Sequence, residues 1–201
     1  SDVTRNNQAV QLSRREIRFM REVVNHRIVP ILDSHESADR VWFTMPYLEG
    51  GRFADRVAPG KPMSPESAVP IVRQVAEALQ FAHANKGTLH RDLKPANILL
   101  DTRGNAYLAD FGLGRELSGD SILTQADQQC PGTVAYLSPA AAEGLSEDSR
   151  GDIYGLGAVL YELLTGQPPY QGTRREILDR LKSQPPRPLR EINRNCPHAL
   201  A

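Results

Sequence analysis

Two short polar motifs, separated by one apolar stretch, constrain this sequence more than any other feature. The first contains Asp92, Lys94 and Asn97, and the second begins with Asp110, thirteen residues after Asn97. Phosphoryl transfer to a hydroxyl group requires a carboxylate that accepts the hydroxyl proton, oxygen ligands for Mg²⁺ and a cation near the transferred phosphate. These four side chains are of the required types. The spacing therefore predicts one loop and one following turn around a nucleoside triphosphate.

The residues between the two motifs predict the turn that brings them together. Residues 98–100 and 106–109 are apolar, and the segment between them contains Gly104 and Asn105, which favour a hairpin turn. We therefore expect Asn97 and Asp110 at the ends of neighbouring strands.

The N-terminal part of the sequence predicts a small unit that contains a sheet. Residues 13–25 have apolar side chains at helical spacing, and two strand-like runs, 29–32 and 41–48, follow as a predicted hairpin. The glycines in Glu49-Gly50-Gly51 break this pattern. We place a boundary there between a small unit and a larger, helical one.

The sequence of the larger unit predicts three helices. Residues 64–87 begin with a serine and a proline and end with a glycine, which favours a long helix over this range. Residues 153–164 are apolar on nearly all sides and predict a buried central helix, whereas residues 174–182 predict a shorter amphipathic helix. The proline-rich tail, 184–201, is expected to be extended. A surface connector is favoured there over a polyproline ligand.

Composition argues against several classes of function. Lysine plus arginine and aspartate plus glutamate number 24 each, so no net charge favours nucleic acid or an anionic membrane surface. No stretch approaches the length of about 18 apolar residues that a membrane span needs. Cys130 and Cys196 are too few and too far apart for a disulfide framework, which fits the cytoplasm. The polar N-terminus has no initiating Met, and we expect it to be a cut within a longer chain.

The run from His90 to Asn97, His-Arg-Asp-Leu-Lys-Pro-Ala-Asn, followed by Asp110-Phe111-Gly112, resembles the paired catalytic motifs of the eukaryotic-type protein kinases. Residues 159–170 are closest in character to the bacterial members of that family. The resemblance implies an α+β, two-lobed protein-kinase fold. It also implies a protein serine/threonine kinase, which transfers the γ-phosphoryl group of ATP, with Mg²⁺, to a protein substrate. The alternative is a set of turn and cap residues in an unrelated α/β protein.

The resemblance assigns roles to the four polar side chains. Asp92 would be the catalytic base, and Lys94 would neutralise charge on the γ-phosphate, although it could also be a solvated surface lysine. Asn97 and Asp110 would bind Mg²⁺, and Asp110 would also face the nucleotide phosphates.

The resemblance also implies residues that bind the nucleotide. Glu16 would form an ion pair with a nucleotide-binding lysine, although Ser13-Arg-Arg-Glu16 is also a capping box. Met45 would be the gatekeeper before the hinge, and it could equally be an ordinary core residue. The expected nucleotide contacts share an apolar or aromatic character: Met45, Tyr47, Leu48 and Leu99.

Structural roles are implied for several further residues. His90 and Phe111 would stack with Met20 and Ile31 in an apolar spine. Asp152 would anchor the backbone of the 90–97 loop, although an aspartate near a helix N-terminus is also favoured by capping alone. A long activation segment would follow Asp110, with a phosphate on it bound by Arg91. The candidate phosphorylation sites are Ser118, Ser121 and Thr124.

Three features depart from the family pattern. No glycine-rich loop and no Val-Ala-Ile-Lys-like strand precede Glu16, the sequence stops before the last expected helices, and Ser138-Pro139-Ala140 replaces Ala-Pro-Glu. We therefore expect an incomplete catalytic domain, inactive by itself. Residues 1–48 would be a partial small lobe, with the αC helix, two strands and the hinge, and residues 49–201 a large lobe without its last helices. A nucleotide- or partner-binding pseudokinase and a small-molecule phosphotransferase remain alternatives.

Overall fold

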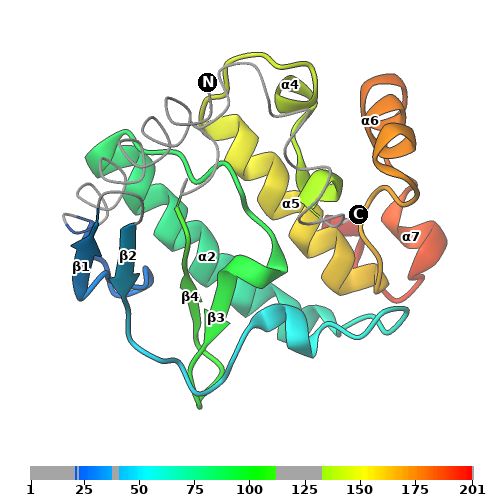
Figure 1. Cartoon of the computed structure of the whole chain (residues 1–201). Coiled ribbons are helices and arrows are strands. Elements are labelled where there is room, and N and C mark those ends of the chain that lie inside the picture. Colours follow the sequence, from blue (N-terminus) through cyan, green and yellow to red (C-terminus); the bar gives the residue numbers. More distant parts are fainter. Residues whose placement is uncertain (1–20, 22, 38–40, 112–132, 201) are drawn as a thin grey trace.

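The computed structural model describes residues 21, 23–37, 41–111 and 133–200 (Figure 1). The strands and α-helices in chain order are β1 (Asp33–Glu36), β2 (Val41–Thr44), α2 (Pro65–Lys86), β3 (Ile98–Leu100), β4 (Ala106–Leu108), α4 (Pro139–Ala142), α5 (Ser149–Thr165), α6 (Arg174–Ser183) and α7 (Leu189–Ile192). Short 3-10 helices lie at Phe53–Arg56, Pro95–Asn97, Thr133–Tyr136 and His198–Leu200.

The long helix α2 forms at the position that its end signals predict. Ser64 caps its N-terminus by accepting a hydrogen bond from the backbone of Ser67, and Gly87 ends it in the left-handed conformation with φ 61°. The buried side chains of Val75 and Leu79 face the core. Figure 1 shows α2 in the middle of the molecule, between the β3–β4 hairpin and α5.

Helix α5 is the second central element, and it is less completely buried than the sequence predicts. Val159, Leu163 and Leu164 are fully buried, and Gly166 ends the helix with φ 76°. Ile153, however, is 61% exposed, so the prediction of burial on nearly all sides is wrong at this end. Asp152, next to it, points inward, and a neighbour about 100° around the helix then faces outward.

The predicted hairpin between the two polar motifs is confirmed. β3 and β4 pair antiparallel, with Ile98 opposite Leu108 and Leu100 opposite Ala106. The backbone N–H of Ala109 donates to the carbonyl of Asn97 at 2.9 Å, which brings Asn97 next to Asp110.

The N-terminal hairpin exists, but its first strand is not the predicted one. β1 covers the polar residues 33–36 and pairs with β2, Asp33 opposite Thr44, whereas residues 29–32 are not a strand. Val29 pairs elsewhere, because its backbone N–H donates to the carbonyl of Leu108 at 2.9 Å, whereas the N–H of Leu32 donates to the carbonyl of Thr44 in β2 at 2.8 Å. The expected helix over residues 13–25 lies mostly outside the described residues. Residues 23–25 are not helical, so its predicted end is too late.

The C-terminal region is more structured than the sequence predicts. Helix α6 is confirmed, with Ile177 and Leu181 buried and a capping box at its N-terminus. The expectation of an extended tail is wrong over α7 and the last 3-10 helix. Leu189 and Cys196 are buried against the core, and the Asn193 side chain donates to the carbonyl of Leu164 at 2.7 Å, so these contacts fold the tail.

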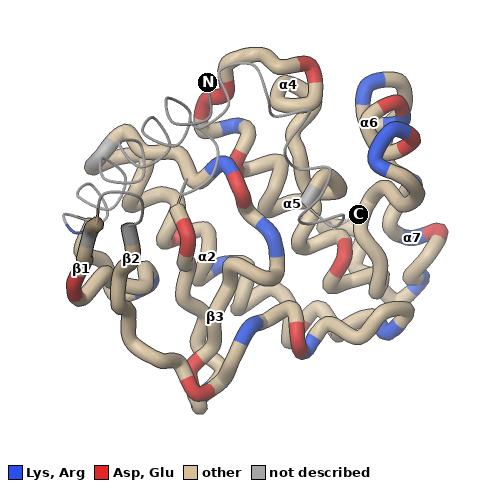
Figure 2. The backbone as a smooth tube through the Cα atoms, in the orientation of Figure 1, with Lys and Arg blue, Asp and Glu red and all other residues tan. Residues whose placement is uncertain are grey.

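Charge is distributed without a dominant sign. Figure 2 shows acidic and basic positions interspersed along the described backbone, and α6 carries both. Within the described residues, no helix has the length and apolar character that crossing a membrane requires.

Candidate active site

The loop over residues 90–97 brings the predicted side chains of Asp92, Lys94 and Asn97 into contact. Lys94 Nζ lies 2.8 Å from Asp92 Oδ2. Asn97 Nδ2 donates to the Asp92 backbone carbonyl at 2.7 Å and to Asp92 Oδ2 at 3.1 Å. The 3-10 turn over residues 95–97 brings Asn97 back toward Asp92. One oxygen of the Asp92 carboxylate is therefore held by two donors in a partly buried setting.

Asp110 lies beside this loop in a strained backbone conformation. The hydrogen bond between Ala109 and Asn97 places it at the adjacent strand end, and its φ is 58°. A non-glycine residue with positive φ costs on the order of 1–3 kcal/mol and often marks a functional site. Arg91 has the same feature, with φ 63°. In the described chain these two residues are the non-glycine positions with positive φ.

Asp152 holds the backbone of the loop, as predicted. Its Oδ2 accepts from the backbone N–H of His90 and its Oδ1 from that of Arg91, each at 2.8 Å. Asp148, not Asp152, is the N-cap of α5, so capping does not explain the position of Asp152. The side chain of Asp152 is almost fully buried, and Nε2 of His83 on α2 lies 2.7 Å from its Oδ2.

His90 links the loop to Asp110 from inside the core. Its Nε2 donates to the Ala109 carbonyl at 2.9 Å, and its Nδ1 accepts from the Asp92 backbone N–H at 3.3 Å. These two bonds require the neutral imidazole, and burial lowers the pKa of His90 accordingly. The ring lies 4.7 Å from that of Phe111, so this part of the spine is confirmed. Ile31 packs partly buried against the same core, and Met20 lies outside the described residues.

The predicted nucleotide contacts are only partly brought together. Met45 and Asp110 line the same small hollow, whose other walls include Phe111 and Ile31. Tyr47 is 87% exposed, and Leu48 is half-buried at the turn that follows. Leu99 on β3 is half-buried, while its neighbours Ile98 and Leu100 face the core. Glu16 lies outside the described residues.

Two side-chain contacts tie the segment that leads into α4 to α5 and to the loop before α5. Ser138 Oγ caps α4 and donates to Glu147 Oε1 at 2.8 Å, close to Ala140, where the family glutamate is absent. The Tyr136 hydroxyl donates to Glu162 Oε2 at 2.6 Å. Burial raises the pKa of both groups of this pair. Cys130 and the candidate phosphorylation sites, Ser118, Ser121 and Thr124, lie outside the described residues.

Sequence reasoning missed His83, Tyr136 and Glu162. The sequence offers a weak signal for His83, a histidine in the last two turns of a helix that leads directly to the polar loop. Nothing in the linear pattern pairs it with Asp152, because the two residues are 69 positions apart. Tyr136 and Glu162 are 26 positions apart, and the contact between them depends on tertiary packing.

The donor set near Asp92 suits a hard divalent cation that is shared with phosphate. Among the described residues, no group of three or more His, Cys, Asp or Glu side chains could cage a metal alone. Asn97 uses its amide nitrogen toward Asp92, which leaves its amide oxygen as an acceptor, and Asp110 adds an exposed carboxylate. Mg²⁺ is commonly held by one or two such protein oxygens together with phosphates and water. Asn97 and Asp110 therefore fit Mg²⁺ chemically.

Comparison with curated proteins identifies relatives of this arrangement. The family model described as protein kinase domain matches residues 2–196. The chain is 40% identical over 166 residues to the serine/threonine-protein kinase PknB of Mycobacterium leprae, with 78% of this chain covered. It is 37% identical over 171 residues to PrkC of Bacillus subtilis, with 85% of this chain covered. The chain spans 26% of the length of each of these relatives.

Solved kinase structures share the fold of this chain. The crystal structure of the Mycobacterium tuberculosis PknI kinase domain aligns with a TM-score of 0.70 at 24% identity, covering 96% of this chain and 68% of that chain. Rad53 1–466 in complex with AMP-PNP aligns with a TM-score of 0.70 at 26% identity, covering 88% and 44%. The chain belongs to the protein kinase domain family, as a bacterial eukaryotic-like serine/threonine kinase domain.

Proposed function

We propose that the protein that contains this chain transfers the γ-phosphoryl group of ATP to Ser or Thr hydroxyls of a protein substrate. The observation that carries the proposal is the fixed carboxylate of Asp92. Lys94 and Asn97 both donate to its Oδ2, at 2.8 and 3.1 Å, and these two bonds leave Oδ1 for an acceptor hydroxyl. Asp92 accepts the proton of that hydroxyl, and Lys94 offsets negative charge on the phosphoryl group.

Asn97 and Asp110 are the proposed ligands of Mg²⁺. The bound ion would supply charge neutralisation at the phosphates. The two residues belong to neighbouring strand ends, so one short hairpin sets the separation of both ligands. His90 strengthens this arrangement, because its neutral ring bonds both to Asp92 and to the residue before Asp110.

ATP would lie between a small lobe, residues 1–48, and a large lobe, residues 49–201. The adenine contacts would come from Met45, Tyr47, Leu48 and Leu99, and Glu16 would pair with a lysine outside this sequence. Met45 and Asp110 line the same small hollow, so the proposed gatekeeper and one proposed Mg²⁺ ligand lie near each other. Rad53, a structural neighbour at 26% identity, was solved with AMP-PNP, and the relatives named above are serine/threonine-protein kinases.

The proposal is tested by separating nucleotide binding from turnover. The assay uses a polypeptide in which a glycine-rich loop and a lysine strand precede residue 1, either from the natural gene or by fusion with those strands of PknB. Asp92→Asn should leave the affinity for ATP with Mg²⁺ nearly unchanged and lower turnover by a factor of about 10²–10⁴, the usual contribution of a positioned base. Residues 1–201 without that addition should transfer no phosphate above the Asp92→Asn background.

The two alternatives predict different results in the same assay. A pseudokinase would bind ATP with Mg²⁺, and its turnover would not differ between the parent and Asp92→Asn. A small-molecule phosphotransferase would phosphorylate an aminoglycoside and leave a protein acceptor unmodified. Either outcome would replace the proposal.

A further inference from the structure

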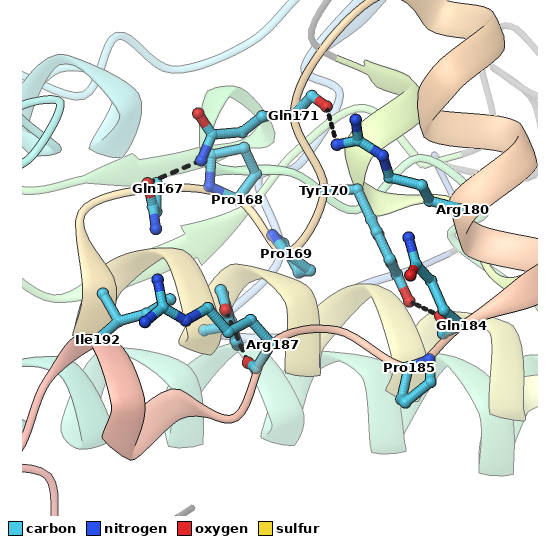
Figure 3. Close-up of a pocket in the computed structure, with 11 residues that line it drawn as sticks. Gln167, Pro168, Pro169, Tyr170, Gln171, Arg180, Gln184, Pro185, Arg187 and Ile192 are labelled. Carbon is cyan, nitrogen blue, oxygen red and sulfur yellow. Dashed lines mark hydrogen bonds between the residues drawn. The ribbon is translucent and has the colours of Figure 1, made fainter.

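We infer that the groove between the α5–α6 loop and the proline-rich segment before α7 is a docking site for an extended, acidic segment of a partner protein. The groove has a volume of about 350 Å³ and lies among Pro168, Tyr170, Arg180, Pro185, Arg187 and Ile192 (Figure 3). This volume is within the range of about 300–1,000 Å³ that is typical of ligand pockets. The site contains none of the residues to which the phosphoryl transfer is assigned.

Two tyrosine hydroxyls make one wall of the groove rigid. Tyr170 donates to the carbonyl of Gln184 at 2.8 Å, and Tyr161 donates to the carbonyl of Arg187 at 2.9 Å. Both rings are almost fully buried. The segment between the two carbonyls is therefore held at one end by the α5–α6 loop, through Tyr170, and at the other by α5, through Tyr161. A wall that is already ordered reduces the entropy lost when a ligand binds.

The other wall is fixed by a chain of polar contacts. Arg180 Nη1 donates to the backbone carbonyl of Gln171 at 3.0 Å, and Gln171 Nε2 donates to Gln167 Oε1 at 2.7 Å (Figure 3). The prolines of both walls have no backbone N–H, and their rings offer flat apolar contact to an extended chain.

The charge of the lining selects an acidic occupant. Among the residues that line the groove, the charged ones are Arg180 and Arg187, and no Asp or Glu is present. Each guanidinium has five N–H donors in a planar fork that suits a carboxylate. Arg187 Nε is bonded to Glu191 Oε2 at 3.1 Å, so this arginine is oriented from the side of α7 while the remainder of its fork stays available for a ligand.

The groove is also joined to the segment that precedes α4. Tyr170 packs in an apolar cluster with Val134 and Leu137, and Tyr154 packs against the same cluster. A partner segment bound in the groove would therefore lie against Tyr170, which packs on residues 134–142 from the other side. The inference concerns binding and does not depend on phosphoryl transfer.

A direct binding assay tests the inference. The probe is a fluorescein-labelled peptide of alternating Glu and Pro, which is extended because proline favours the polyproline II conformation. Peptides of Gln and Pro and of Lys and Pro serve as charge controls. We expect saturable binding of the Glu-Pro peptide by fluorescence anisotropy and weaker or no binding of the other two.

Charge-reversal variants distinguish binding in the groove from nonspecific attraction to the charge of the whole protein. Arg180→Glu with Arg187→Glu should weaken Glu-Pro binding by about tenfold or more, because two charge contacts become repulsive. The matched control is Arg73→Glu with Arg175→Glu, which makes the same charge change at exposed arginines that also pair with a nearby acid but lie outside the groove. A glutamate at position 180, near the end of α6, opposes the helix dipole and so also affects the helix itself. Arg180→Gln with Arg187→Gln therefore provides a second test, because it removes both positive charges without adding negative ones.

Several results would overturn the inference. These are the absence of saturable binding, equal losses in the groove and control variants, and equal binding of the Lys-Pro peptide. Self-association in light scattering that disappears in the groove variants would show that a second copy of the chain, not an acidic partner, occupies the groove.

Discussion

Asp152→Asn should be strongly destabilising, because one buried carboxylate accepts from three donors. The donors are the backbone N–H groups of His90 and Arg91 and Nε2 of His83. An asparagine has one acceptor oxygen. If this oxygen takes the place of Oδ2 and accepts from His83 and His90, the amide NH₂ must face the backbone N–H of Arg91.

Two effects lower the free energy of unfolding of Asp152→Asn: one donor loses its partner, and the remaining hydrogen bonds become weaker. A buried donor without a partner costs about 1–3 kcal/mol, and exchanging a charged acceptor for a neutral one removes roughly half of the strength of each remaining bond. Together these losses amount to about 3–5 kcal/mol, a large fraction of the 5–15 kcal/mol that is typical of a domain. Arg91 would also lose the contact that holds its backbone at φ 63°.

Urea denaturation followed by circular dichroism measures this change. Asp148→Asn is the matched control, because Asp148 is the exposed N-cap of the same helix and asparagine caps a helix as well as aspartate does. Asp148→Asn should change the free energy of unfolding by only a small fraction of the change in Asp152→Asn. Equal unfolding midpoints for the two variants would refute the anchoring role of Asp152.

Two further predictions concern the buried ring of His90 and the close backbone approach at Gly50. Because burial lowers the folded-state pKa of His90, the unfolded chain binds a proton first as the pH falls, and stability should drop by up to about 1.4 kcal/mol per pH unit below about 6.5. This dependence should be weaker in His90→Gln; an identical pH profile in the variant would contradict the assignment. Gly50→Ala should lower the melting temperature, since its Cβ would lie 2.3 Å from the Asp101 carbonyl oxygen, whereas Gly157→Ala, which has open space in α5, should raise it or leave it unchanged. The same shift in both glycine variants would disprove the close approach at Gly50.

The parts of the fold that follow from local chemistry could be predicted from the sequence. Ser64 and Gly87 bound α2 through their own side-chain and backbone preferences, so the helix appears where these signals are. The β3–β4 hairpin likewise follows from its turn residues, and with it the proximity of Asn97 and Asp110.

The parts that depend on competition between distant segments could not be predicted. Val29 pairs with the end of β4 instead of β2, and the polar residues 33–36 become the strand. Asp152 faces inward because it binds the backbone of the 90–97 loop, about 60 residues earlier in the chain, and Ile153 next to it is therefore exposed. The contact between His83 and Asp152 depends on how α2 packs against α5, which periodicity does not encode.

The identity of the phosphorylated residue tests the central claim most directly. A polypeptide that supplies the glycine-rich loop and lysine before residue 1 is incubated with radiolabelled ATP, Mg²⁺ and a protein acceptor that contains Ser, Thr and Tyr. The acceptor is then hydrolysed for phosphoamino-acid analysis. The account predicts phosphoserine and phosphothreonine, which disappear in Asp92→Asn and when Mg²⁺ is chelated. Phosphate on Tyr alone, or equal labelling by the parent and Asp92→Asn, would contradict it.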